Sequence, residues 1–241
     1  MEVHENKYSK VLARRALQVQ RGGARAAVLG VNDGLVSVLC LVLTVAGAGA
    51  APGSVLLAGF AGLIAGAVSM AAGEWISVRA QVELFAGILK DINHFMKVDK
   101  KLLVGQLASS LGRSGHNDKT ALKAAEEIAT DHDHLVEAYA RQVMGFNPDE
   151  LGSPWLAAFS SFALFTLGAL APLSPWIFTS GVFAVVLSIV LTAIGGMIVG
   201  GYIALSSGKN IMIGALRQLG IVVLASVVTY GVGYIFGVSV A

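Results

Sequence analysis

Apolar residues are grouped along this chain into five long runs, and the polar residues gather in the segments between them. The runs cover about 26–49, 54–78, 155–171, 176–203 and 214–238. Each is close to the roughly 20 residues that an α-helix needs to cross a bilayer. The chain is 55% hydrophobic and 13% charged. The pattern therefore predicts an all-α, polytopic membrane protein with five transmembrane helices and a helical insert between spans two and three.

The polar segments divide the chain into four parts. They are a basic N-terminal segment (1–25), the first two spans (26–78), a polar insert (79–150) and the last three spans (151–241). For the N-terminal segment two interpretations are open, a helix on the inner membrane surface and a disordered tail. The insert is predicted to be helical in three stretches, about 79–98, 100–111 and 118–144.

Positive charge is distributed unequally between the two sides of the predicted bilayer. All 17 Lys and Arg fall in 1–25, 79–150 and the connection 209–217, which share one side in a five-span topology. Loops rich in Lys and Arg stay in the cytoplasm. The sequence therefore predicts a cytoplasmic insert and a C-terminus on the outside.

Two acidic residues, Asp33 and Glu74, interrupt the first two apolar runs. A turn signal lies between these runs, centred between residues 51 and 52, and Asp33 and Met70 are each 18.5 residues from that centre. In a tight antiparallel hairpin the two residues would lie at one depth. Glu74 follows Met70 by four residues, which puts both on one helix face.

These three side chains form a candidate metal site within the membrane. A charged side chain at the bilayer centre costs at least about 2.5–3.5 kcal/mol, so such an acid needs a partner. A carboxylate together with a thioether suits first-row divalent metals. Simpler interpretations stay open: Asp33 could pair with Arg25, Glu74 with Arg79, and Met70 could only pack.

A second candidate metal site lies in the insert. On one continuous helix Glu127, Asp131 and His134 would share a face and could hold a divalent ion. A solvated acidic face explains the same residues equally well. The sequence contains no HExxH, GxSxG or P-loop pattern, and we expect no enzyme activity, no organic cofactor and no nucleic-acid partner.

Three segments strongly resemble the vacuolar iron transporter family: GVNDGLVSV (30–38), AGLIAGAVSMAAGEWISV (61–78) and LGALAPL (167–173). The resemblance implies a homodimer whose ion path runs between the subunits and exchanges cytosolic Fe²⁺, sometimes Mn²⁺, for protons. The aspartate and methionine of the family's path correspond to Asp33 and Met70, and a glutamate of the same motif corresponds to Glu74. It implies a lipid-embedded protein, in the cell membrane of a prokaryote or a vacuolar-type membrane of a eukaryote.

The insert departs from the pattern of the plant-type members of that family. Those members carry glutamate pairs on the first helices of the insert, whereas this chain has Glu83 and Asp91 without an ExxE pair. At the positions of the family's later Met-Met…Glu set it has Tyr139, Ala140 and Val143. The resemblance therefore does not extend to the family's cytoplasmic iron site, and two interpretations are open: the acids and histidines of 127–137 replace it, or nothing does.

Two functions of different classes follow from these observations. The first is a proton-coupled exporter of divalent metal, with the choice between Fe²⁺ and Mn²⁺ open. The alternative is a membrane-bound metal sensor or partner-binding protein that uses the insert and does not transport. A sensor would not need a carboxylate inside the membrane, so Asp33 discriminates between them.

Overall fold

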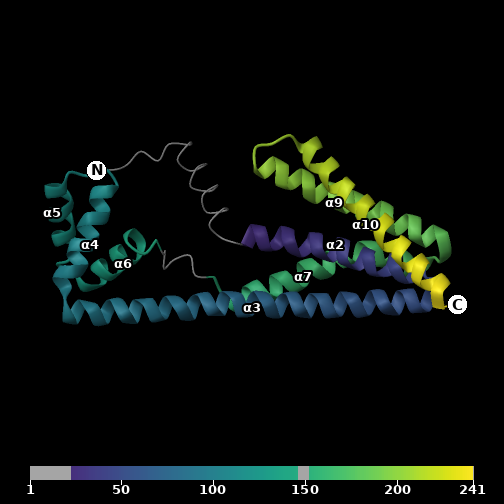
Figure 1. The fold of residues 1–241 in the computed structure, drawn as a ribbon, viewed down its shortest axis with the longest axis horizontal. Helices are drawn as coiled ribbons and strands as arrows, with labels where there is room; N and C mark the ends of the chain where they lie inside the picture. The colour runs from purple at the N-terminus through teal and green to yellow at the C-terminus, as the bar shows by residue number, and fades with distance from the viewer. Residues whose placement is uncertain (1–22, 146–151, 241) are drawn as a thin grey trace. The chain divides into compact units, whose positions relative to one another are not determined.

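The computed structural model describes residues 23–145 and 152–240, and in these residues the chain is built from helices (Figure 1). The helices are α2 (Gly23–Gly47), α3 (Pro52–Val98), α4 (Lys100–Arg113), α5 (Asp118–Ile128), α6 (His132–Gln142), α7 (Pro154–Leu173), α8 (Pro175–Phe178), α9 (Gly181–Ser206) and α10 (Ile211–Val240). Helix α2 already includes the end of the segment 1–25. The rest of that segment lies outside the described residues.

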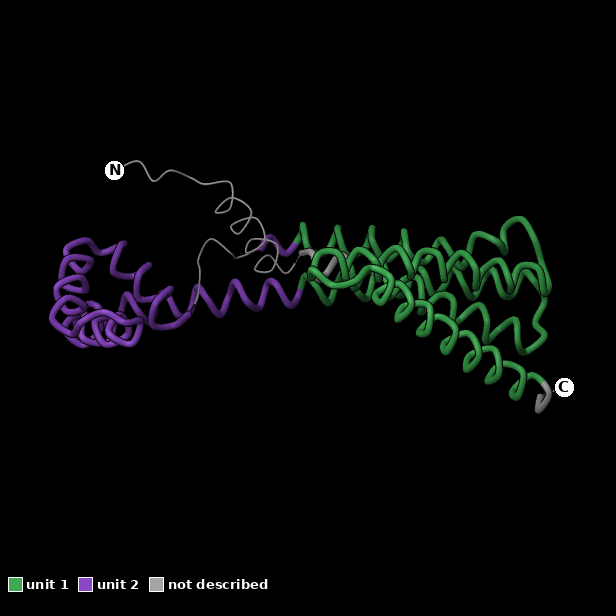
Figure 2. The backbone as a smooth tube through the Cα atoms, turned by 90° about the horizontal axis from the view of Figure 1, so that it is seen from above, with its two compact units in different colours: residues 1–75, 155–241 green, residues 76–154 purple. Residues whose placement is uncertain are grey.

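The chain forms two compact units (Figure 2). One contains the residues up to Trp75 and those from Trp155 onward, and the other contains residues 76–154. Helix α3 begins in the first unit and ends in the second. We call the first the transmembrane unit and the second the insert unit.

In the part of the chain that the structure describes, five helices are long and apolar enough to cross a membrane: α2, α3, α7, α9 and α10. Large apolar side chains lie on the outside of the transmembrane unit; Leu57 is 71% exposed and Val182 is 77% exposed. Water-soluble proteins rarely expose apolar surface of this extent. The predicted all-α fold with five membrane-spanning helices is thus confirmed.

The connections between the spans follow the sequence closely, with one difference. Helix α2 ends at Gly47, Gly49 takes a positive φ of 76°, and Pro52 starts α3, as proline commonly starts a helix. The fourth span was expected to start near residue 176. It starts instead at Gly181, because Pro175–Phe178 form the separate turn α8 and Thr179 and Ser180 are extended.

Close contacts between backbones hold the transmembrane unit together. A Cβ added to Gly200 of α9 would lie 2.4 Å from the carbonyl oxygen of Gly214 in α10. A Cβ added to Gly233 of α10 would lie 2.0 Å from the carbonyl oxygen of Thr44 in α2. Small residues permit such approaches between membrane helices, where packing rather than water exclusion drives association. Helices α2, α9 and α10 therefore form one tightly packed group.

Helix α3 packs on the other side of α2, together with α7. Their shared apolar core includes Val42 of α2, Leu63 of α3, and Phe165 and Leu173 of α7. All four side chains are less than 9% exposed. The first two spans therefore form the antiparallel hairpin that the sequence predicted, with the third span packed against both.

The insert unit has its own apolar core, centred on Leu107 of α4 and Leu135 of α6, which are both fully buried. The side chain of Asp99 accepts a hydrogen bond from the Leu102 amide and begins α4. The prediction of one helix over 118–144 was wrong. The chain breaks between α5 and α6 because the Lys100 ammonium donates to the Ala129 carbonyl (2.6 Å) at the end of α5, and Asp131 caps the start of α6.

Candidate functional site

Three consecutive residues of α2, Asn32, Asp33 and Gly34, face three different surroundings. Successive residues of a helix are about 100° apart around its axis. Asn32 accepts a hydrogen bond from the side-chain amide of Gln218 in α10. A Cβ added to Gly34 would lie 2.1 Å from the carbonyl oxygen of Phe165 in α7. Contacts with α10 and α7 thus fix α2 on either side of Asp33.

The Asp33 side chain lies between these two contacts and is half-buried. Its Oδ1 accepts a hydrogen bond of 2.7 Å from the hydroxyl of Ser37, one turn further along the same helix. Ser37 itself is exposed at the surface of the transmembrane unit. Among the described residues no cation pairs with Asp33, and the side chain of Arg25 lies outside the part that the structure describes. Asp33 therefore presents a carboxylate near the surface of a membrane-spanning helix.

The register of the hairpin can be read from a contact nearer the turn. A Cβ added to Gly62 of α3 would lie 2.3 Å from Cδ2 of Leu41 in α2. Asp33 is eight residues before Leu41, and Met70 is eight residues after Gly62. In antiparallel helices these equal offsets bring Asp33 and Met70 to one level, about 12 Å beyond the contact.

Met70 is half-buried and packs against the apolar core shared by α2, α3 and α7. This contact agrees with the simpler interpretation of Met70 as a packing residue and leaves part of the side chain accessible. Phe165 also reaches both helices near this level, since its ring approaches Gly66 and its carbonyl oxygen approaches Gly34. Helix α7 therefore supports both helices of the hairpin near Asp33 and Met70.

Glu74 lies one turn beyond Met70 on α3 and is half-buried. Arg79, the cation that the sequence offered as its partner, instead forms an ion pair with Glu83 (Nε–Oε1 2.6 Å). Within the described ranges 23–145 and 152–240, no hydrogen bond or ion pair joins Glu74 to another side chain. The interfacial salt bridge that the sequence left open as an alternative is therefore absent there, and the Glu74 carboxylate is available for another role.

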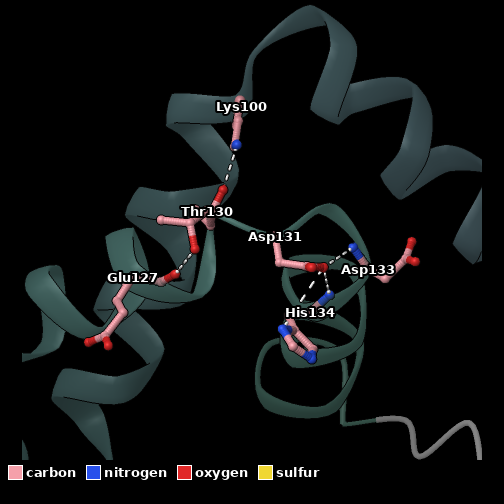
Figure 3. A network of polar contacts seen from close by, with 7 residues as sticks. Lys100, Glu127, Thr130, Asp131, Asp133 and His134 are labelled. Atoms are coloured by element: carbon pink, nitrogen blue, oxygen red, sulfur yellow. Dashed lines mark hydrogen bonds and ion pairs between the residues drawn. The ribbon is translucent and has the colours of Figure 1, made fainter.

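The second candidate site is arranged differently from the sequence expectation. Glu127 is near the end of α5 and His134 is in α6, so the single helix that would align them with Asp131 does not exist. In Figure 3 the Glu127 carboxylate points away from Asp131 and His134. No group of three His, Cys, Asp or Glu side chains in the described residues could hold a metal ion. The proposed common face of Glu127, Asp131 and His134 was wrong.

Asp131 has a structural task that explains its presence. Its carboxylate accepts hydrogen bonds from the backbone amides of Asp133 (2.8 Å) and His134 (3.0 Å), which begin α6. The bond from the His134 amide is the main reason that the pKa of Asp131 is lowered below its ordinary value. The cap is therefore complete above the ordinary aspartate pKa of 3.8 and is lost as the pH falls through the lowered pKa of Asp131.

We predict that Asp131→Ala loosens the start of α6. The amides of Asp133 and His134 lose their acceptor, so their hydrogen exchange in the whole protein should become faster at pH 7. Glu126→Ala, at an exposed position in the last turn of α5, is the matched control and should leave both amides unchanged. Equal exchange in Asp131→Ala and the unaltered protein would contradict the capping role.

An amide pair next to Asp33, formed by Asn32 and its partner Gln218, was not singled out from the sequence. A signal for them existed, because amide side chains are costly within apolar spans and imply a hydrogen-bonding partner. Gly34 was part of the quoted GVNDGLVSV segment, but nothing in the sequence gives its contact with α7.

Comparisons with known proteins cover most of the chain. The sequence model of the VIT family matches residues 24–234. A vacuolar iron transporter of Acanthamoeba castellanii is 31% identical over 220 residues, which cover 89% of this chain and 78% of the relative. Vacuolar iron transporter homolog 2 of Oryza sativa subsp. japonica is also 31% identical over 220 residues, which cover 88% of this chain and 89% of the relative.

A third relative, vacuolar iron transporter homolog 2.1 of Arabidopsis thaliana, is 31% identical over 199 residues, covering 79% of this chain and 74% of the relative. The relatives are named as transporters, in agreement with the prediction that this chain is not an enzyme. The match extends across all five spans. The chain therefore belongs to the VIT family.

Proposed function

We propose that this protein moves a divalent metal ion, Fe²⁺ first and Mn²⁺ second, out of the cytosol in exchange for protons. The observation that carries the proposal is the Asp33 carboxylate, which lies in an apolar span near the protomer surface and has Ser37 as its hydrogen-bond partner. An intramembrane acid that faces an accessible surface commonly marks an ion path. The names of the relatives support iron as the metal.

Three residues would act in sequence along the path. Asp33 and Met70, which the hairpin register brings to one level, would hold the partly dehydrated ion. Glu74 lies one turn from Met70 on the side of Arg79, and would pass the ion between that level and the cytoplasm. A hard carboxylate with a softer thioether suits Fe²⁺ better than Mg²⁺ or Ca²⁺.

The proposed coupling to protons is a competition at one group. A carboxylate must lose its proton before it binds a metal ion, so metal binding releases a proton. If Asp33 cannot hold a proton and a metal ion at once, every metal ion that enters from one side displaces a proton. Protonation of Asp33 from the other side then displaces the metal ion. A proton gradient directed into the cytosol would then drive metal ions out of the cytosol, and no additional coupling group would be needed.

The proposed assembly is a homodimer with the path between its subunits. Ser37 is exposed and Asp33 is half-buried, so this part of α2 is accessible at the surface of one copy. A second copy packed on this side would enclose the carboxylate and exclude lipid from it. The resemblance of residues 30–38 and 61–78 to the family supports this arrangement.

Orientation follows from the charge distribution, and we predict that the insert faces the cytoplasm. Cysteine introduced by Glu126→Cys, on the exposed side of α5, should react with a membrane-impermeant maleimide only from the cytoplasmic side. Cysteine introduced by Ser180→Cys, which is exposed between α8 and α9, should react only from the outside. Both variants carry Cys40→Ser to remove the native thiol. The opposite labelling pattern would overturn the proposed orientation.

Met70→Ala tests the metal ligand set. We expect weaker transport of Fe²⁺ and a relative shift toward Mn²⁺, because the soft thioether is lost while the carboxylates stay. The measurement is competition between the two ions for flux into proteoliposomes. Leu63→Ala, in the same apolar core, is the control for loss of packing. An unchanged preference in Met70→Ala would remove Met70 from the proposed ligand set.

A further inference from the structure

Two amide side chains that are far apart in the sequence meet inside the transmembrane unit. Nε2 of Gln218 in α10 donates a hydrogen bond to Oδ1 of Asn32 in α2. Gln218 is only 5% exposed, and neither residue has a role in the proposed metal path. Burying an amide without a partner is costly, so the pair is strongly favoured over any arrangement that separates it.

Helix α9 holds Gln218 in place from behind. A Cβ added to Gly196 would lie 3.0 Å from Cγ of Gln218, and a Cβ added to Gly200 would lie 3.0 Å from its Cβ. The Gln218 side chain thus occupies room that these two glycines provide. The donor is therefore fixed by α9 and α10 together and cannot easily follow a displacement of α2.

A fixed donor sets the rotation of α2 about its own axis. Asn32 and Asp33 are consecutive, so a rotation that moves Asn32 away from Gln218 moves the Asp33 carboxylate by the same angle. On the opposite side, Gly34 approaches the backbone of α7 closely, which limits the distance between the helices. Because Gly34 has no side chain, its contact with α7 does not set the rotation of α2. The hydrogen bond between the Asn32 and Gln218 amides does set it.

We propose that Gln218 is a positioning residue, which by its hydrogen bond to Asn32 keeps the Asp33 carboxylate directed at the metal path. This inference rests on the proposed function and extends it to a residue of the fifth span that would not touch the metal. The groups facing Asp33 would stay the same when Gln218 is changed. Only the direction of the carboxylate would differ.

The experiment compares Gln218→Leu, which keeps the approximate size of the side chain but not its hydrogen bond, with Ser226→Ala. Ser226 is the matched control because it is also buried in α10 and its hydroxyl donates within its own helix, to the Val222 carbonyl. Two quantities are measured in each variant. The first is Fe²⁺ flux in proteoliposomes, reported as its KM and kcat. The second is the reactivity toward a water-soluble methanethiosulfonate of a thiol introduced by Asp33→Cys in a Cys40→Ser background.

We expect Gln218→Leu to raise the KM for Fe²⁺ by between about threefold and about fifteenfold, which corresponds to the strength of hydrogen bonds between membrane helices. It should slow labelling of the introduced thiol by a similar factor, because the side chain at position 33 turns away from the path. Ser226→Ala should change neither quantity. The double variant Asn32→Gln with Gln218→Asn exchanges the partners and keeps the amide pair. It should restore much of the original KM for Fe²⁺ and of the original labelling rate.

Unchanged KM and labelling in Gln218→Leu, or equal effects in Ser226→Ala, would overturn the inference. If Gln218→Leu does not fold, Asn32→Ala removes the acceptor at the less buried residue and is judged by the same two quantities. Failure of the proposed function would give a different result from failure of this inference. It would appear as Fe²⁺ flux that does not depend on Asp33. The labelling rate would still report whether Gln218 sets the direction of that side chain.

Discussion

Replacing Asp33 by asparagine is expected to reduce pH-driven metal flux to the level of vesicles without protein. The substitution keeps the size of the side chain and an oxygen that can accept from Ser37, whose hydroxyl donates to Asp33 at 2.7 Å. It removes both the negative charge that attracts the metal and the group that exchanges a proton for it. Because the proposed coupling depends on that one exchange, no partial activity should remain.

The measurement is metal uptake into proteoliposomes with an acidic lumen, for molecules whose insert faces outward. Asp91→Asn, the same chemical change at an exposed acid of the insert unit, is the control and should leave flux at its normal value. Both variants should be compared at equal amounts of folded protein. Uptake in Asp33→Asn that still responds to the gradient would remove Asp33 from the coupling step.

Replacing Gly34 by alanine is expected to destabilise the whole transmembrane unit. The added Cβ would lie 2.1 Å from the Phe165 carbonyl oxygen and 2.9 Å from the Ala169 nitrogen, and both are backbone atoms that cannot turn away. Overpacking of this kind costs about 1–3 kcal/mol or more. This exceeds the roughly 1 kcal/mol that alanine gains over glycine in a helix. Separation of α2 from α7 should also displace the neighbouring Asp33 and reduce flux.

Gly73→Ala provides a control in which the expected change in stability has the opposite sign. This glycine is within helix α3, and no atom lies within 4 Å of the added Cβ. Only the gain in helix propensity should remain, so the melting temperature in detergent should rise slightly, whereas that of Gly34→Ala should fall. A similar small rise in both variants would show that the contact between α2 and α7 is looser than described.

Some of this structure follows directly from the sequence, and some of it depends on contacts that the sequence does not reveal. The five spans are set by long apolar runs, which in a bilayer leave few choices other than helices. The common level of Asp33 and Met70 follows from counting along a tight hairpin, and the contact of Leu41 with Gly62 agrees with that count. Local rules are sufficient for these features.

Other features require three-dimensional information. The segment 118–144 has helical character throughout, yet it breaks where Lys100, far earlier in the chain, bonds to the Ala129 carbonyl and Asp131 caps the next helix. The face expected for Glu127, Asp131 and His134 disappears with that break. Likewise, the contact between Asn32 and Gln218 joins residues 186 positions apart, and no pattern in one sequence pairs them.

The central claim is that metal and protons cross in exchange, and the most direct measurement follows both in the same vesicles. Proteoliposomes with an acidic lumen and a pH-sensitive dye inside would receive Fe²⁺ outside, under reducing conditions, for molecules whose insert faces outward. We predict that Fe²⁺ enters and that the lumen becomes more alkaline at the same time, and that Asp33→Asn abolishes both changes. Fe²⁺ entry without any change in lumenal pH, and at a rate independent of the imposed gradient, would contradict the proposed exchange.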